Sequence, residues 1–285
     1  MASAREGVFV TVGELREHIA SGAPVTVLDV RWSLAEPDGE QGYLSGHLPG
    51  AVYVSLDDEL SDHRLAGRGR HPLPSGTDLQ AAARRWGVRK GVPTVVYDDW
   101  NRAGSARAWW VLTAAGIAGV RILDGGLAAW SAAGETLQSG PVTPEAGDVD
   151  VVHDDLYNGA LRTLTAEQTQ SAVDVLLDAR APERFRGDVE PVDPVAGHIP
   201  GATNLPSTQF LSSDGTLLAD APLRALLADR GVAGGADIGT YCGSGVTAAL
   251  AVAGLAAAGV DAALYPGSWS EWASNPDRPV ARGER

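Results

Sequence analysis

The stretch "SGHLPGAVYV" at residues 45–54 decides how this chain is organised, because a close variant, "AGHIPGATNL", follows at residues 196–205. Self-similarity at such a spacing indicates that one folding unit is present twice. Further matched pairs keep the same order along the chain: "VTVLDVRW" at 25–32 with "VDVLLDAR" at 173–180, "TVVYDD" at 94–99 with "DIGTYC" at 237–242, and "GGLAAW" at 125–130 with "GSWSEW" at 267–272. The shared order predicts a tandem duplication.

Each copy has the pattern of an α/β domain. Short apolar, β-branched runs such as "TVVYDD" alternate with Ala- and Leu-rich segments of helical periodicity such as "ARAWWVLTAAGI" at 106–117. This alternation predicts a mostly parallel sheet flanked by helices in each copy. The intervening stretch "SGPVTPEAGDVD" is rich in Gly, Pro and acidic residues. We therefore expect an N-terminal domain over residues 1–138, a linker over 139–150 and a C-terminal domain over 151–285.

Composition limits the classes of partner. The formal net charge is −14, from 36 acidic and 22 basic residues, which disfavours binding to nucleic acid or to an anionic membrane. No run is long and apolar enough to cross a bilayer, and the first residues lack the pattern of a secretory signal. The single cysteine cannot form an internal disulfide. We expect a cytoplasmic protein in a reducing compartment.

The duplication also separates structural from functional residues, because features present in both copies serve the shared fold. His47 and His198 each occupy a Gly-His-aliphatic-Pro-Gly turn, so we expect their imidazoles to bind nearby backbone groups. Arg31 and Arg180 follow matched aspartates at the same spacing and are predicted to be structural charges at strand ends.

Cys242 occurs only in the second copy, where the aligned residue of the first copy is Asp99. It lies between a predicted strand and a predicted helix, so orphan N–H groups and the helix dipole favour its thiolate form. Gly243 and Gly245 allow successive N–H groups to converge as an anion-binding nest. A buried, inert cysteine is the alternative, and helix capping is the alternative role for Ser244 and Thr247.

The absence of a cation from this loop narrows the chemistry. A cysteine phosphatase needs an arginine at the end of its loop to grip phosphoryl oxygens, but position 248 is alanine and the loop holds no Arg or Lys. A compact, uncharged cradle formed by residues 243–247 fits a single bound sulfur atom better.

The whole chain resembles the two-domain rhodanese sulfurtransferases. The motifs that carry this resemblance are "GHLPGA" and "GHIPGA", "DGGLAAW" and "GSWSEW", and "YCGSGVTA". The resemblance implies a catalytically inactive N-terminal domain with Asp99 in place of cysteine, and a C-terminal domain in which Cys242 takes a sulfane sulfur from a donor. The persulfide then passes its sulfur to a thiol or to cyanide. No cofactor or metal is implied.

The resemblance also implies a donor-binding set. The loop "CGSGVT" is similar to that of 3-mercaptopyruvate sulfurtransferases, which assigns Gly243, Ser244, Gly245, Val246 and Thr247 to the sulfur cradle, with Ser244 in proton handling. Thiosulfate enzymes of the family carry basic residues at the two positions after the cysteine.

Arg184 matches the arginine with which the family binds the donor anion, and its first-copy counterpart is Ala35. The family's second arginine is replaced by Val192, and Arg186 is a candidate substitute. The donor, mercaptopyruvate or thiosulfate, therefore stays open. A persulfide carrier or regulatory module without efficient turnover of a small donor is the alternative function.

The remaining expectations concern partners and neighbouring residues. Because no second cysteine can resolve a persulfide, the acceptor must be external, either a small thiol or a thioredoxin-like protein. An acidic residue of the N-terminal domain, Asp57 or Asp58, is a candidate contributor to the site that the sequence does not assign. Trp269 and Glu271 occur in the second copy only and are expected at the entrance to the pocket.

Overall fold

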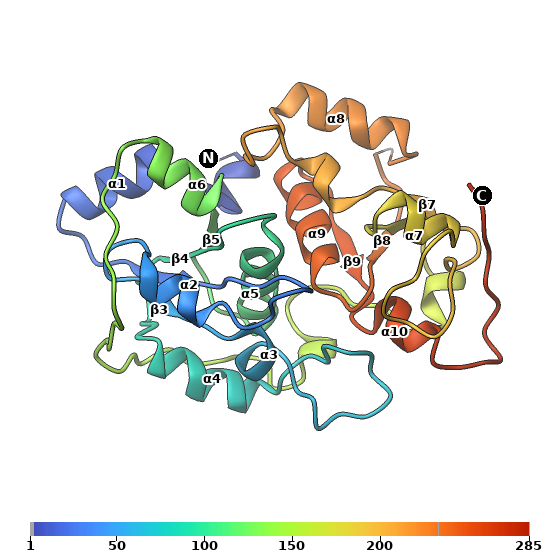
Figure 1. Cartoon of the computed structure of the whole chain (residues 1–285), viewed down its shortest axis with the longest axis horizontal. Coiled ribbons are helices and arrows are strands. Elements are labelled where there is room, and N and C mark those ends of the chain that lie inside the picture. Colours follow the sequence, from blue (N-terminus) through green and yellow to red (C-terminus); the bar gives the residue numbers. More distant parts are fainter. Residues whose placement is uncertain (1–2, 233, 285) are drawn as a thin grey trace. The chain divides into compact units, whose positions relative to one another are not determined.

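The computed structural model describes residues 3–232 and 234–284 and divides into two compact units (Figure 1). Unit 1 comprises residues 3–62, 73–161 and 212–217. Unit 2 comprises residues 63–72, 162–211 and 218–284. The segment 63–72 thus belongs to unit 2 although it lies within the N-terminal half of the sequence. Residues 139–150 contain no helix or strand, and the domain boundaries drawn from sequence stay a prediction.

Each unit is built on a fully parallel sheet. In unit 1 the strand order is β1-β5-β4-β2-β3, and in unit 2 it is β7-β6-β8-β9. The strands of unit 1 are β1 Phe9–Val10, β2 Thr26–Asp29, β3 Val52–Tyr53, β4 Thr94–Tyr97 and β5 Val120–Leu123. Those of unit 2 are β6 Val175–Asp178, β7 Thr203–Asn204, β8 Ile238–Tyr241 and β9 Ala262–Leu264. The α/β prediction with parallel sheets is confirmed.

Helices flank both sheets, as parallel strands require of their connections. Those of unit 1 are η1 Arg5–Gly7, α1 Val12–Ala20, α2 Glu40–Ser45, α3 Leu56–Glu59, α4 Gly76–Arg85, α5 Ala103–Ala114, α6 Gly126–Ala132 and η2 Leu156–Asn158. Those of unit 2 are η3 Gln168–Gln170, α7 Pro182–Arg186, η4 Ser207–Phe210, α8 Asp220–Asp229, α9 Thr247–Ala257 and α10 Ser268–Trp272.

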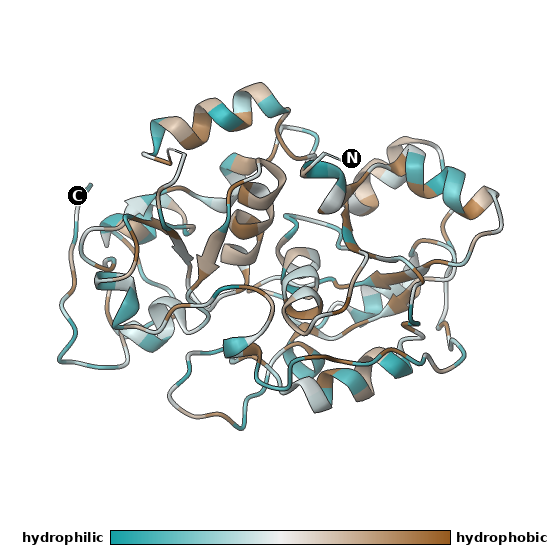
Figure 2. Cartoon of the chain, turned by 180° about the vertical axis from the view of Figure 1, so that it is seen from behind, coloured by the Kyte–Doolittle hydropathy of each residue, from teal (hydrophilic) through white to brown (hydrophobic). Residues whose placement is uncertain are grey.

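The sequence of each helix sets its place in its unit. In α9, nine of the eleven residues are buried, and Figure 2 colours this helix mostly brown or white. A helix that is apolar on all sides must be covered on all sides. By contrast, α8 alternates hydrophilic and hydrophobic residues in Figure 2 and buries only Leu223 and Leu227. The central helix that follows β8 is therefore held firmly in the core of unit 2.

A matched polar cluster lies at the end of the central strands in both units. In unit 1, Arg31 donates from Nε and Nη2 to Asp29 at 3.0 and 2.9 Å and also binds the Gly46 carbonyl. In unit 2, Arg180 makes the same contacts with Asp178 and with the Gly197 carbonyl. The prediction that these charges are structural is confirmed.

The paired histidines also serve the fold. His47 Nδ1 lies 2.8 Å from the Leu48 carbonyl oxygen, and His198 Nδ1 lies 2.7 Å from that of Phe185. Both side chains are fully buried. The prediction that both imidazoles bind nearby backbone groups is confirmed.

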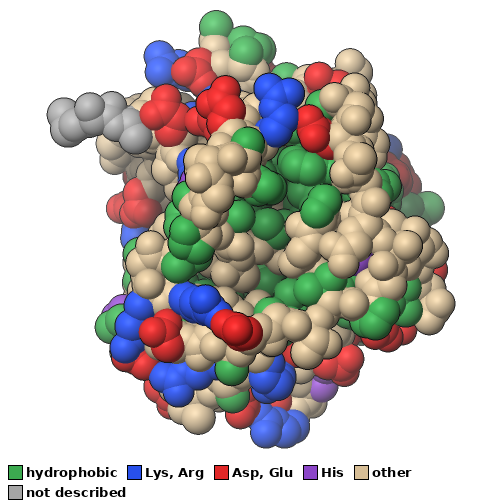
Figure 3. All heavy atoms as spheres, turned by 90° about the vertical axis from the view of Figure 1, so that its left-hand side faces the viewer, with side chains coloured by type: hydrophobic (Ala, Val, Ile, Leu, Met, Phe, Trp, Pro, Cys, Tyr) green, Lys and Arg blue, Asp and Glu red, His purple; other side chains and the backbone are tan. Residues whose placement is uncertain are grey.

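The surface carries both signs of charge in spite of the acidic balance. On the face drawn in Figure 3, Lys and Arg side chains are interspersed with Asp and Glu side chains. No helix among the described residues is long and apolar enough to span a membrane.

Candidate active site

Cys242 lies in the loop that joins β8 to α9, as the sequence predicted. Its side chain is 2% exposed, and the N–H of Gly245 donates a hydrogen bond to Sγ at 3.2 Å. Gly245 has φ = +77°, and a Cβ at this position would lie 2.4 Å from the Pro266 carbonyl oxygen. Only glycine allows this backbone conformation at such close approach. The glycine at position 245 therefore explains why the loop can fold back toward the sulfur.

The N-cap residue of α9 is Val246, and Thr247 is the first residue of the helix. Among the described residues, the Val246 side chain makes no capping hydrogen bond. Neither Ser244 nor Thr247 therefore occupies the N-cap position. The N–H groups of the first turn and the helix dipole stay directed toward the loop that holds Cys242.

The loop is supported from behind by the segment that begins α10. The N–H of Cys242 donates to Ser268 Oγ at 3.1 Å, and the N–H of Trp269 donates to the Cys242 carbonyl at 3.0 Å. The N–H of Ser270 donates to the Gly243 carbonyl at 2.9 Å. These bonds hold the backbone on both sides of the sulfur.

Two guanidinium groups lie beside Gly243, the residue directly after the cysteine. A Cβ built on Gly243 would lie 3.5 Å from Arg184 Nη1 and 3.1 Å from Arg70 Nη2. Arg184 comes from α7, as the sequence predicted, whereas Arg70 comes from the segment 63–72. The loop itself holds no cation, but its surroundings supply two.

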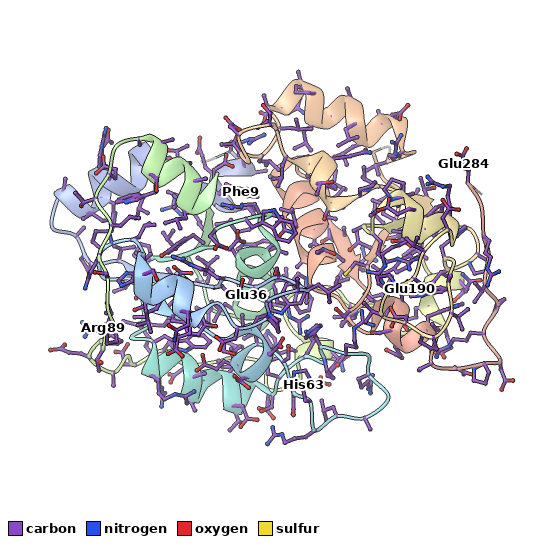
Figure 4. The ribbon with its side chains drawn as sticks, viewed as in Figure 1. Phe9, Glu36, His63, Arg89, Glu190 and Glu284 are labelled. Carbon is purple, nitrogen blue, oxygen red and sulfur yellow. The ribbon has the colours of Figure 1, made fainter. Side chains whose placement is uncertain are left out.

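The segment after α7 provides the counter-ions. Arg184 Nη2 donates to Glu190 at 2.6 Å, and Arg70 Nη1 forms an ion pair with Asp193. Figure 4 labels Glu190 in this segment and His63 at the start of the segment 63–72. Burial alone would raise the pKa of Glu190, but hydrogen bonds from Arg184 and from backbone N–H groups outweigh it and hold the pKa below the usual value. For Asp193, burial dominates and raises the pKa, against the opposing effect of Arg70.

His71 is a further neighbour of the loop. Its Nδ1 lies 2.8 Å from Ser244 Oγ, and both side chains are buried. Ser244 therefore has a titratable partner through which a proton can move.

Sequence reasoning missed both Arg70 and His71. The stretch "GRGRHPLP" at residues 67–74 was a usable signal, because it concentrates basic residues in an acidic chain and no matched segment was found for it in the second copy. It was overlooked because its position in the sequence assigns it to the N-terminal domain.

Three other candidates have identified partners within their own units. Trp269 is fully buried in the core, where its indole N–H binds the Val195 carbonyl at 2.9 Å, so its expected place at a pocket entrance is wrong. Arg186 pairs with Asp188. In unit 1, Asp57 accepts a hydrogen bond from Trp32 Nε1 at 3.2 Å.

The alignment of Asp99 with Cys242 is one residue out. Across β2 and β4, Asp29 pairs with Tyr97, and across β6 and β8, Asp178 pairs with Tyr241. The residue after the tyrosine is Asp98 in unit 1 and Cys242 in unit 2. The backbone agrees, because the Leu127 N–H donates to the Asp98 carbonyl at 3.0 Å just as the Trp269 N–H donates to that of Cys242. Because Asp98 and Asp99 are adjacent, the sequence alone allows either residue to be aligned with Cys242.

Asp98 fills its own loop with a carboxylate. Oδ1 accepts from the N–H groups of Trp100 and Arg102, each at 3.1 Å, and Oδ2 accepts from the N–H and Oγ of Ser105 at 3.0 and 2.7 Å. The two loops have equal length, since α5 begins five residues after Asp98 and α9 five residues after Cys242. The backbone of the two loops differs, because Arg102, four residues after Asp98, has φ = +63°, whereas Val246, four residues after Cys242, has φ = −86°.

Among the described residues, no group of three or more His, Cys, Asp or Glu side chains is arranged to hold a metal ion.

The sequence matches the rhodanese-like domain over residues 11–133 and 161–275. A Mycobacterium tuberculosis protein named thiosulfate sulfurtransferase SseB is 65% identical over 280 residues, covering 98% of this chain and 99% of its own length. The 3-mercaptopyruvate sulfurtransferase of Escherichia coli is 36% identical over 281 residues, covering 95% and 97%. The crystal structure of Escherichia coli SseA, a 3-mercaptopyruvate sulfurtransferase, has a TM-score of 0.79 at 33% identity and covers 92% of this chain and 98% of that one.

Proposed function

This chain belongs to the rhodanese-like domain family and is a sulfurtransferase, and we propose that Cys242 carries the transferred sulfur as a persulfide. The observation that carries the proposal is the loop after β8, where Cys242 stands in the position that an anionic carboxylate occupies in unit 1. A persulfide adds one atom beyond Sγ and is anionic, and the Gly245 N–H, which donates to Sγ at 3.2 Å, together with the N-terminus of α9 favours negative charge at this place.

The reaction divides into two transfers. With 3-mercaptopyruvate as donor, the Cys242 thiolate attacks the donor sulfur and the C–S bond breaks, leaving its electron pair on carbon as an enolate. The thiol proton of the donor leaves to a base, the enolate takes up one proton, and the products are the Cys242 persulfide anion and pyruvate. An acceptor thiolate then attacks the outer sulfur and releases the Cys242 thiolate. Covalent catalysis of this kind gives ping-pong kinetics.

Ser244 and His71 are suited to the proton step. The Ser244 hydroxyl follows the cysteine by two residues, and the 2.8 Å contact with His71 Nδ1 places an imidazole beside that hydroxyl. We assign to this pair the delivery of a proton to the departing group, which would otherwise leave as an unprotonated enolate.

The donor is a small anion. Arg184 and Arg70 lie beside Gly243 and supply the positive charge that the loop lacks, which supports turnover of a small anionic donor over the alternative of a carrier module loaded only by a partner protein. Because the sequence holds a single cysteine, the acceptor is external, and we propose a small thiol or a thioredoxin-like protein. A free thiol also fits the cytoplasmic location that we propose.

Mass spectrometry of the intact chain tests the proposal. After incubation with 3-mercaptopyruvate or with thiosulfate, the wild type is expected to gain the mass of one sulfur atom, and cyanide is expected to remove it. Cys242→Ser keeps the size of the side chain and is expected to gain none. The proposal fails if neither donor adds sulfur, or if Cys242→Ser gains sulfur as the wild type does. A carrier module would accept sulfur from a persulfidated protein yet show no steady-state turnover with either small donor.

A further inference from the structure

We propose that unit 1 binds a methylated ammonium cation in a cavity beside Trp32 and Trp100. The inference goes beyond the proposed function, because the cavity contains none of the residues to which sulfur transfer is assigned. The cavity has a volume of about 190 Å³. Its lining includes one arginine, two carboxylates and two tryptophans, which are Arg31, Glu36, Asp99, Trp32 and Trp100. Figure 4 labels Glu36, in the stretch between β2 and α2.

The aromatic and acidic residues at this cavity distinguish unit 1 from unit 2. The strand register of the two sheets aligns Trp32, Asp99 and Trp100 with Ala181, Gly243 and Ser244. A residue that serves the shared fold is expected in both copies. The tryptophans and the carboxylate are therefore candidates for a function that belongs to unit 1 alone.

Trp100 is an exposed aromatic side chain on a fixed backbone. The residue is 64% exposed. Its N–H donates to Asp98 Oδ1 at 3.1 Å, and its carbonyl accepts from Arg102 Nη2 at 2.6 Å. Both of these partners are buried, so they hold the loop in one place. Because exposing a large indole ring to water is unfavourable, a tryptophan held in this way indicates a surface that a ligand covers.

The charge around the cavity favours a cation. Arg31 is only 6% exposed, and it donates from Nε and Nη2 to Asp29 at 3.0 and 2.9 Å. Its positive charge is thus balanced by a buried carboxylate. Asp99 Oδ2 lies 4.0 Å from Arg31 Nη1, and Glu36 also lines the cavity. One guanidinium therefore stands against three carboxylates, which leaves an excess of two negative charges.

The combination of indole rings with carboxylates suits a methylated ammonium group. The face of an indole ring attracts a cation, and tryptophan does so more strongly than the other aromatic residues. Methyl groups on the nitrogen contact the ring and lower the cost of removing the cation from water. The cavity is smaller than the roughly 300–1,000 Å³ typical of sites for drug-sized ligands. It therefore fits a cationic head group better than a whole cofactor.

Ligand-observed NMR with choline tests the inference on the full chain at constant ionic strength. Saturation transfer to the N-methyl protons reports binding, and a titration gives the Kd. The matched probe is the neutral alcohol in which carbon replaces the choline nitrogen, because it has the same shape without the charge. Choline is expected to bind with a Kd on the order of 1 mM, and the neutral alcohol at least about tenfold more weakly.

Two variants locate the bound cation. Trp100→Leu keeps an apolar side chain and removes the ring, and it is expected to weaken choline binding about 3- to 30-fold. Asp99→Asn keeps the shape and removes the charge, with an expected loss of about three- to tenfold. Glu17→Gln is the matched control, since Glu17 is an exposed carboxylate of α1 that does not line the cavity. Cys242→Ala should also bind choline as the wild type does.

A second probe distinguishes the two sources of such a cation. A short peptide that carries trimethyllysine presents the same group on a protein side chain. If this peptide binds more tightly than choline, the natural ligand is a methylated protein. If it binds equally or more weakly, the ligand is a small molecule.

Several results would overturn the inference. The first is a neutral alcohol that binds as tightly as choline. The second is a set of Kd values for choline that stay within about 1.5-fold of the wild type in both Trp100→Leu and Asp99→Asn. If Trp100→Leu fails to fold, Asp99→Asn decides alone. Loss of choline binding in Cys242→Ala would place the cation at the Cys242 loop and would also refute the inference.

Discussion

In unit 1 the loop that joins β4 to α5 binds a carboxylate of its own, whereas in unit 2 the loop that joins β8 to α9 holds a buried thiol. The Asp98 carboxylate gathers the N–H groups of Trp100, Arg102 and Ser105. The Arg102 side chain is itself 1% exposed. The Cys242 loop has small residues at the corresponding positions, and its charges come from Arg70 and Arg184 outside the loop.

The difference shows what duplication preserved and what it changed. Both loops have the same length, follow the same strand and start a buried helix. In unit 1 the loop N–H groups bind the Asp98 side chain, whereas in unit 2 the Gly245 N–H binds the Cys242 sulfur, which we propose to be the reactive atom. Loops of equal length, with different backbone conformations, thus hold a structural side chain in one unit and the proposed nucleophile in the other.

Replacing Cys242 with aspartate, the residue of unit 1, should have the largest effect on activity. Cys242→Asp is expected to reduce sulfur transfer to below about one thousandth of the wild-type rate, because no nucleophile remains. The new carboxylate should accept the loop N–H groups as Asp98 does. It should make the variant about 1–3 kcal/mol more stable than Cys242→Ala, the usual range for hydrogen bonds to a charged group.

Activity assays and urea unfolding of the two variants measure these effects. Cys242→Ala serves as the control, because it removes the thiol without adding an anion. If Cys242→Asp proves less stable than Cys242→Ala, the loop of unit 2 does not favour an anion at this position.

Removing the Asp98 carboxylate from unit 1 should lower the free energy of unfolding more than removing the Cys242 thiol from unit 2. Asp98→Ala leaves Arg102 buried without its ion-pair partner, 3.0 Å away in the wild type, and is expected to cost about 3–5 kcal/mol. Cys242→Ala removes only one buried sulfur and should cost about 1–2 kcal/mol. Denaturant unfolding followed by tryptophan fluorescence compares the two. Equal losses would contradict a purely structural role for the loop in unit 1.

The smallest effect concerns pH, because the charge of Asp193, whose partners Arg70 and Arg184 lie beside the Cys242 loop, changes with pH. Burial raises the pKa of Asp193, although Arg70 opposes the shift, and Arg184 and Glu190 also face this carboxyl group. The folded protein therefore binds this proton at a higher pH than an unfolded chain. Its stabilising effect is fully present below the ordinary pKa of aspartate and is lost as the pH rises through the raised value.

The same protonation leaves Arg70 without a counter-ion. As the pH falls through the raised pKa of Asp193, the KM for thiosulfate is expected to fall relative to that for 3-mercaptopyruvate, by a factor of about 10 or less. Asp193→Asn should remove this dependence. A ratio of KM values that varies equally with pH in both proteins would show that another group titrates.

Much of the fold was determined by the sequence itself. Alternating apolar and helical segments specify parallel sheets, and the repeated Gly-His-aliphatic-Pro-Gly turns identify the duplication, since these patterns depend on neighbours a few residues apart. The same comparison marked Cys242 and Arg184, because each is present in one copy only. The role of the matched Asp-Arg pairs also followed, since a residue needed in both copies must serve what the copies share.

Other features were decided only by the tertiary structure. Strand register shows that Asp98, and not its neighbour, corresponds to Cys242, because only pairing across the sheet distinguishes adjacent aspartates. Arg70 and His71 reach the loop because the segment 63–72 packs into unit 2. The local sequence pattern does not indicate against which unit such a segment packs. Its place is set by contacts with residues about 200 positions away, among them the bond from the Arg70 N–H to Ser270 Oγ.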